Sequence, residues 1–413
     1  MKHGGDVYSH GILEGKKILD YSSNINPLPI SKEFSSRIKE ALEMVILYPD
    51  VKYRTLKDDI IQYLKKSESY FLKFEDESEN STELSEGKYI QGSFLDEEYS
   101  APKMTLEKLK PTSEVRELKV TSDYLKGITR ENILVGNGAS EILDLIISSL
   151  KSITIVVPSF VEYEDFSKKY KVSINYSYLN QGMEYDYEDI LLKLENTEAL
   201  IIGNPNNPNG CIIDADKFMR ILDMCEKLNK LVIIDEAFIE FVLDYDKSII
   251  QYIDKYKCIV IVRAITKFFG MPGIRFGYGI TRNEKLMHYF SNTQNPWSVN
   301  CFAELAVKYA LKDAVFIDKS KAWINTERKY MYNMLSNISF IEKVYISYGN
   351  YFLCKLKYIS SGKLYDHMLN HGILIRNCDN YVGLDDSYVR LAIKDRSSNE
   401  VLLKTLEVIA ENI

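Results

Sequence analysis

Residues 258–277 read CIVIVRAITKFFGMPGIRFG, and this stretch decides the fold. Residues 258–263 form an apolar, β-branched run, which predicts a buried strand. A Gly-containing turn follows, with Lys267 near its start and Arg275 eight residues later. A lysine needs partial desolvation to attack an aldehyde, and a phosphate needs a fixed cation. An isolated loop lysine is usually only solvated, so the interpretation depends on the sequence around it.

Residues 123–300 show the same alternation of short apolar runs and helical patterns. The runs at 152–157, 199–203 and 231–235 join the one at 258–263. This alternation is typical of a parallel sheet with crossover helices. Ligands of open α/β sheets bind at the carboxyl ends of the strands, so side chains that follow each run are candidate site residues.

Polar residues or glycines follow three of the apolar runs in residues 123–300. Asp235 ends one run and can pair with a protonated ring nitrogen. Asn207, in the turn GNPNNPNG at 203–210, can donate a hydrogen bond, although a plain Asn-Pro turn is common. Gly138, Ala139 and Ser140 precede a helical pattern at 142–150, where backbone N–H groups and the helix dipole can hold an anion.

An aromatic residue, Phe160, follows a fourth strand in the sequence Pro158-Ser-Phe160. Its ring can stack on a planar ligand, although a residue of this kind alone is more often part of the core. Taken together, the motifs resemble the fold-type I pyridoxal-phosphate (PLP) enzymes, the aspartate-aminotransferase superfamily. The resemblance covers the chain apart from residues 67–122.

The resemblance implies a fold and a role for each motif. The expected fold is α/β, a large domain with a mostly parallel seven-stranded sheet and a smaller α+β domain. The residues implied to hold the cofactor, pyridoxal 5′-phosphate, are Lys267 (Schiff base and catalysis), Asp235 (ring nitrogen), Asn207 (phenolic oxygen), Phe160 (stacking), and Gly138, Ala139, Ser140 and Arg275 (phosphate). Tyr48 is implied to reach the cofactor phosphate of a neighbouring subunit, so a homodimer with shared active sites is expected.

The two ends of the chain suggest the substrate. Arg390, in the apolar context YVRLA, matches the arginine that clamps a substrate carboxylate, and Arg376 looks like a second anion-binding arginine. The N-terminal segments HGG at 3–5 and DYSSNINP at 20–27 are similar to those of the threonine-phosphate decarboxylases of cobalamin biosynthesis. In that family, His3 and Asn26 match positions that face the substrate phosphate.

The alternative activity is that of a histidinol-phosphate aminotransferase, because the two families are related. Those aminotransferases usually have tyrosine where Phe238 stands, and phenylalanine cannot bond the phenolic oxygen of the cofactor. The outcome depends on which Cα bond stands perpendicular to the cofactor ring, and the sequence does not give this angle. A PLP-binding regulator is a distant alternative, which would need a DNA-binding domain, and no basic helix for one is evident.

The composition of the chain excludes some classes of partner and sets one segment apart from the rest. The chain has 413 residues, a hydrophobic fraction of 46% and a net charge of −7, with no basic stripe, so we expect small-molecule ligands and neither nucleic acid nor membrane. Residues 67–122 hold 13 acidic and 7 basic residues without lasting periodicity, which predicts a surface insertion. We expect an N-terminal arm at 1–47, a large domain at 48–295 and a small domain at 296–413.

The N-terminus has no apolar signal stretch, and six scattered cysteines form no metal-ligand pattern. We therefore expect a cytoplasmic protein with reduced thiols and no metal site.

Overall fold

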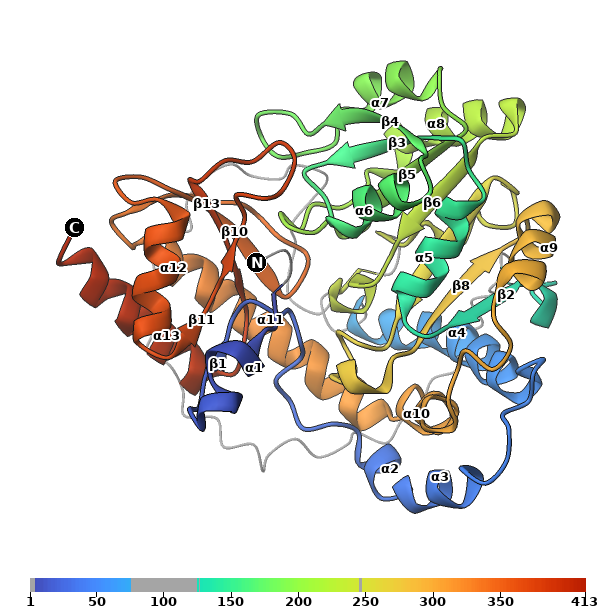
Figure 1. Ribbon diagram of the computed structural model, residues 1–413, viewed down its shortest axis with the longest axis horizontal. Coiled ribbons are helices and arrows are strands. Elements are labelled where there is room, and N and C mark those ends of the chain that lie inside the picture. The colour runs from blue at the N-terminus through green and yellow to red at the C-terminus, as the bar shows by residue number, and fades with distance from the viewer. Residues whose placement is uncertain (1–3, 76–124, 126, 245–246) are drawn as a thin grey trace.

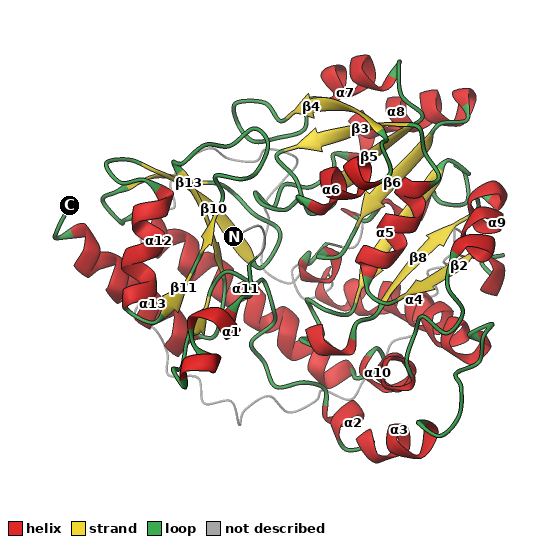
Figure 2. Cartoon of the chain, viewed as in Figure 1, coloured by secondary structure: helices red, strands yellow, loops and turns green. Residues whose placement is uncertain are grey.

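The computed structural model describes residues 4–75, 125, 127–244 and 247–413. These residues form two lobes, which Figure 1 shows side by side with the long helix α11 (Ala314–Ser336) beneath them. Helices and strands alternate through the larger lobe, as Figure 2 shows by colour. The smaller lobe combines about the last quarter of the chain with an N-terminal segment.

A seven-stranded sheet in the order β2-β8-β7-β6-β5-β3-β4 forms the centre of the larger lobe. Only β8 runs antiparallel to its neighbours. The mostly parallel sheet predicted from the sequence is therefore confirmed, and β7 begins one residue later than expected. The strands are β2 (Ile133–Gly136), β3 (Ser152–Val157), β4 (Ser173–Tyr178), β5 (Ala199–Gly203), β6 (Leu231–Asp235), β7 (Ile259–Ala264) and β8 (Gly277–Thr281).

Amphipathic helices cover this sheet. In α8 (Ala215–Leu228), Phe218, Ile221, Leu222 and Cys225 recur at helical spacing and are all buried. The Asp214 side chain caps its N-terminus, and Asn229 ends it in the left-handed conformation. The other helices of this lobe are α4 (Arg54–Glu75), α5 (Ala139–Ser148), α6 (Glu162–Lys169), α7 (Tyr187–Leu194), α9 (Glu284–Thr293) and α10 (Cys301–Ala310), with short 3-10 helices η4 (Arg130–Asn132), η5 (Ile239–Phe241), η7 (Ile249–Tyr252) and η8 (Pro272–Ile274).

The smaller lobe contains a four-stranded antiparallel sheet in the order β12-β13-β10-β9. The N-terminal strand β1 pairs with β11 in parallel, so the beginning of the chain joins this lobe. The elements of this lobe are α1 (Val7–His10), η1 (Ile12–Glu14), β1 (Leu19–Asp20), β9 (Ile341–Val344), β10 (Tyr351–Leu356), α12 (Ser361–Asn370), β11 (Ile373–Leu374), β12 (Arg376–Asn377), β13 (Tyr388–Ala392) and α13 (Arg396–Ala410). The short helices α2 (Lys32–Ser35) and α3 (Ile38–Met44) instead lie against α10 of the larger lobe (Figure 1).

Two expectations from the sequence need correction. The sequence of residues 344–347 looks like a strand, but the strand lies earlier: β9 ends at Val344, and by Tyr348 the chain bonds Gly210 of the larger lobe, with Tyr348 N donating to Gly210 O at 2.9 Å. The insertion expected from residue 67 overlaps α4, which continues to Glu75. The insertion beyond that helix lies almost entirely outside the described residues.

All six cysteines are free thiols. Among the helices of the described residues, none combines the length and the apolar composition needed to cross a membrane.

Candidate active site

Lys267 lies in the turn after β7, at the carboxyl edge of the parallel strands. Its carbonyl accepts a hydrogen bond from Asn26 N at 3.0 Å, and its Nζ lies 5.8 Å from the centroid of the Phe238 ring. Burial, together with the positive charges of Arg390 and Lys394, lowers the pKa of Lys267 to about 8. The amine is therefore neutral more often near neutral pH than that of an exposed lysine, as a nucleophile requires.

Asp235 ends β6 and is buried, with a relative exposure of 9%. Its Oδ2 accepts from Tyr163 Oη at 2.6 Å, and its Oδ1 accepts from Ala237 N at 3.0 Å. Burial raises the pKa of Asp235. A cation placed against this carboxylate would oppose that shift, so the group suits a protonated ring nitrogen.

The N-terminus of α5 forms a cradle with Arg275. Gly138 occupies the N-cap position with φ 87°, and no side chain caps the helix. A Cβ at Gly138 would lie 2.7 Å from Arg275 Nη2, and one at Gly277 would lie 2.3 Å from Ala139 N. Both glycines are thus required for the guanidinium and the backbone N–H groups to converge, which suits a phosphate.

Ser140 and Phe160 complete this side of the site. Ser140 Oγ donates to Glu162 Oε2 at 2.7 Å. The Phe160 ring lies edge-on to the Tyr163 ring, with the two centroids 5.7 Å apart. Because Tyr163 donates to Asp235, only Tyr163 separates the Phe160 ring from that carboxylate. The structure therefore brings the strand-end residues that the sequence singled out into one region.

Asn207 connects the two lobes. Its Oδ1 accepts from Arg390 Nη1 and lies 3.5 Å from Tyr381 Oη. Since Oδ1 faces the arginine, the Nδ2 group is left to donate elsewhere, as expected for a bond to a phenolic oxygen.

Arg390 and Arg376 are both buried, with exposures of 5% and 4%, and stand directly opposite each other on β13 and β12. Arg390 Nη2 donates to Ser22 O at 2.6 Å, whereas its buried Nε has no partner. Arg376 Nη2 donates to Asn380 Oδ1 at 2.7 Å, and its guanidinium lies 5.0 Å from the centre of the Tyr381 ring. Among the described residues, Arg390 forms no ion pair with a carboxylate.

Like charges opposite each other on neighbouring strands repel, and the buried Nε of Arg390 has no partner. The two arginines are therefore arranged for a ligand that carries negative charge.

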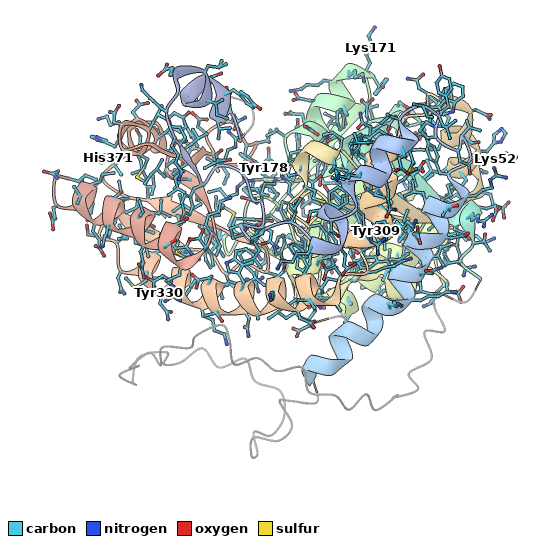
Figure 3. All side chains as sticks on the ribbon, turned by 90° about the horizontal axis from the view of Figure 1, so that it is seen from below. Lys52, Lys171, Tyr178, Tyr309, Tyr330 and His371 are labelled. Carbon is cyan, nitrogen blue, oxygen red and sulfur yellow. The ribbon has the colours of Figure 1, made fainter. Side chains whose placement is uncertain are left out.

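The loop that holds Tyr381 reaches from the smaller lobe onto the larger one. A Cβ at Gly383 would lie 3.4 Å from the Tyr178 ring and 3.5 Å from Pro158. Tyr178 is labelled between the lobes in Figure 3, whereas Tyr330 and His371 lie on the smaller lobe. This loop covers the strand ends next to Phe160.

The N-terminal predictions have different outcomes. His3 lies outside the described residues. Asn26 does not face the arginines, because its Nδ2 donates to Phe268 O at 2.7 Å and Ser320 Oγ at 2.8 Å and its Oδ1 accepts from Leu28 N. These bonds hold the turn at Asn26, and its contact with the substrate stays a prediction. Asn24, two residues earlier, is 1% exposed and has a buried Oδ1 without a partner.

Tyr48 lies away from the Lys267 region of its own chain. Its side chain is 81% exposed and packs against Trp297, with ring centroids 4.8 Å apart. Its contact with a neighbouring subunit stays a prediction.

Several residues around the site were not found from the sequence. Asn24 stands inside the quoted segment 20–27, and Tyr163 follows the quoted Pro158-Ser-Phe160 by three residues, so both were available as signals. Tyr381 and Lys394 had no such signal, because their importance depends on contacts between distant segments.

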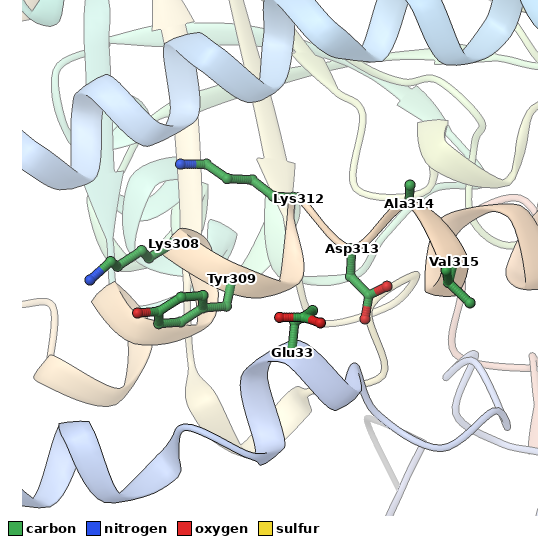
Figure 4. Close-up of a pocket in the computed structure, with 7 residues that line it drawn as sticks. All are labelled: Glu33, Lys308, Tyr309, Lys312, Asp313, Ala314 and Val315. Atoms are coloured by element: carbon green, nitrogen blue, oxygen red, sulfur yellow. The ribbon is translucent and has the colours of Figure 1, made fainter. Parts of the chain in front are cut away.

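A separate surface pocket of about 390 Å³ lies between α2, α10 and the start of α11, as Figure 4 shows. Its polar side chains already have protein partners: Asp313 accepts from Ser31 Oγ, Tyr309 donates to Glu40, and Lys312 pairs with Asp59. None of the residues around Lys267 lines it. We therefore assign no chemistry to this pocket.

Comparison with known proteins places this geometry in context. The family model described as aminotransferase class I and II matches residues 111–406. A protein of Caldanaerobacter subterraneus, provisionally named threonine-phosphate decarboxylase, is 32% identical over 99% of this chain and 94% of its own length. The histidinol-phosphate aminotransferase of the same organism is 32% identical over 68% of this chain and 79% of its own. The solved structure of a histidinol-phosphate aminotransferase from Clostridium acetobutylicum is 42% identical with a TM-score of 0.79, covering 96% of this chain and 100% of that one.

Proposed function

The chain belongs to the class I and II aminotransferase family, whose members depend on pyridoxal phosphate, and from this premise we propose that it decarboxylates L-threonine O-3-phosphate. The products are (R)-1-amino-2-propanol O-2-phosphate and carbon dioxide, a step of cobalamin biosynthesis. The relative that spans 99% of the chain supports this activity.

The residues of the site fit the cofactor. The α5 N-terminus and Arg275 would hold its phosphate, Asp235 its ring nitrogen and Asn207 Nδ2 its phenolic oxygen. Lys267 supplies the amine that binds its aldehyde. When bound, pyridoxal phosphate supplies an electron sink for the electron pair left at Cα when a bond there breaks.

The observation that carries the proposal is the buried arginine pair on β12 and β13. L-Threonine O-3-phosphate has two anionic groups, a carboxylate and a phosphate, and the pair offers one buried guanidinium for each. We assign the carboxylate to Arg390, which is bonded to Asn207, and the phosphate to Arg376 and Asn24. A carboxylate fixed by a rigid arginine has one orientation relative to Cα, and orientation selects the bond that breaks.

Proton movement falls to Lys267. As the Cα–carboxylate bond breaks, carbon dioxide leaves and Cα needs a proton. An amine with a pKa of about 8 can carry a proton near neutral pH and deliver it to Cα in place of the lost carbon dioxide. Phe238 lies beside that amine and contributes an apolar surface without a hydroxyl group.

A second candidate is histidinol-phosphate aminotransferase activity, favoured by the 42% identity to the Clostridium acetobutylicum enzyme. Histidinol phosphate has no carboxylate, so Arg390 would then act on the amino-group acceptor, 2-oxoglutarate. Both candidates use a phosphorylated substrate and the same cofactor residues. They differ in whether carbon dioxide is released.

We also propose that the protein acts as a homodimer. Leu42, Val45, Ile46, Leu47 and Tyr48 on and after α3 are all more than half exposed. An apolar surface of this kind is typical of protein interfaces. A partner seated there would cover Tyr48, the residue expected to reach the neighbouring cofactor.

The test is to incubate the PLP-loaded protein with L-threonine O-3-phosphate and measure carbon dioxide, and in parallel to offer histidinol phosphate with 2-oxoglutarate. We expect carbon dioxide release that Lys267→Ala abolishes and that Lys404→Met, an exposed lysine on α13, leaves intact. Glutamate formation without carbon dioxide would instead establish the aminotransferase.

A further inference from the structure

Segment 21–26, which contains Asn24, is held from both sides of the active site. On the side of the smaller lobe, Ala392 N donates to Tyr21 O at 3.0 Å and Arg390 Nη2 donates to Ser22 O at 2.6 Å. On the other side, Asn26 N donates to the carbonyl of Lys267. The segment therefore connects the substrate arginine directly to the loop of the catalytic lysine.

Lys394 completes this arrangement at its centre. Its Nζ donates to Ser23 O at 3.2 Å and to Ile25 O at 3.3 Å, so one amine holds the peptide on each side of Asn24. Two carbonyls bound by one cation fix the backbone of the residue between them, because charge-assisted hydrogen bonds are the stronger kind. The buried Oδ1 atom of Asn24 itself accepts no hydrogen bond from the described residues.

Lys394 is itself fixed before it bonds to the segment. Its backbone N donates to Asn399 Oδ1 at 3.0 Å, and its carbonyl accepts from Asn399 Nδ2 at 2.8 Å and from Trp323 Nε1 at 2.9 Å. A side chain that starts from a rigid backbone loses less entropy when it makes its bonds. Such an anchor suits a positioning residue better than a solvated lysine.

We propose that Lys394 is a positioning residue of the substrate site: by bonding the carbonyl groups of Ser23 and Ile25, it holds Asn24 beside the buried arginines and so sets the affinity for the phosphate of the substrate. This inference rests on the proposed use of a phosphorylated substrate but not on which reaction follows. The positive charge of Lys394 is also among those that lower the pKa of Lys267.

The test compares four proteins as PLP-loaded enzymes: wild type, Lys394→Met, Lys394→Arg and the matched control Lys404→Met. Methionine keeps the apolar stem and removes both donors, whereas arginine can still bond two carbonyls. We expect the inhibition constant for inorganic phosphate, and KM for the phosphorylated substrate, to rise roughly tenfold in Lys394→Met. The value of kcat should stay within about threefold, and Lys394→Arg should recover most of the affinity.

A double-mutant cycle with Asn24→Ala separates positioning from simple charge. If Lys394 acts through Asn24, then Lys394→Met costs little further phosphate affinity once the amide is gone. Fully additive losses would overturn the proposal, as would unchanged affinity in Lys394→Met or equal loss in Lys394→Met and Lys394→Arg. Phosphate binding is measurable even in an enzyme that turns over neither candidate substrate. Failure of the proposed function can therefore be told apart from failure of the proposed role of Lys394.

Discussion

The cofactor side and the substrate side of this site are built in different ways. On the cofactor side, Asp235 and Gly138 stand at a strand end and a helix start, and their partners Tyr163 and Arg275 also lie in segments that follow strands of the same sheet. On the substrate side, Arg390 and Lys394 bond carbonyl groups of residues 22, 23 and 25, more than 360 positions away. The cofactor side is thus a product of local motifs, whereas the substrate side exists only when the chain ends meet.

The largest expected effect tests the cofactor side by itself. Asp235→Asn keeps the size of the side chain but removes the charge that would hold a protonated ring nitrogen. We expect kcat to fall on the order of a hundredfold to a thousandfold, while KM changes only a few-fold. Steady-state kinetics measure both, with Asp216→Asn on the exposed face of α8 as control. A change confined to KM would mean that Asp235 acts on the substrate side.

A smaller effect is expected from the substrate side. Arg390→Met keeps an apolar side chain in β13 and removes the guanidinium, so kcat/KM for a carboxylated substrate should fall about a hundredfold. The absorbance of bound pyridoxal phosphate should be unchanged. Arg220→Met, which removes an exposed surface pair with Glu188, serves as control. Loss of the cofactor from Arg390→Met would show that the two sides are not separable.

This contrast explains how far the sequence alone predicted the site. Lys267, Asp235 and Asn207 were predicted because a strand followed by a turn is a local pattern, and the structure brings them together. The protein partners of Asn26 were not predicted, because a motif names a segment without giving the direction of its side chains. Lys394 was missed because nothing near it in the chain marks its two carbonyl partners.

A pH experiment measures how strongly the substrate side influences the cofactor side. The protonated Lys267 amine cannot attack an aldehyde, so capture of pyridoxal phosphate by the cofactor-free protein should rise with pH, with its midpoint near the Lys267 pKa of about 8. Removing the Arg390 charge raises the pKa of Lys267, so Arg390→Met should move the midpoint upward. Absorbance during capture gives the midpoint, and an identical midpoint in both proteins would exclude this influence.

The smallest effect is expected where the two sides touch. The Tyr381 hydroxyl lies 3.5 Å from both Asn207 Oδ1 and Arg390 Nη1, at the long limit of a hydrogen bond, while its ring packs under Arg376. Tyr381→Phe keeps the ring and removes the hydroxyl, so kcat/KM should fall only about twofold to fivefold. Tyr381→Ala should cost more, because Arg376 then loses its aromatic neighbour. Measuring kcat/KM for both variants, with the exposed Tyr358→Phe as control, shows whether the ring or the hydroxyl of Tyr381 contributes more. A greater loss of kcat/KM in Tyr381→Phe than in Tyr381→Ala would contradict this assignment.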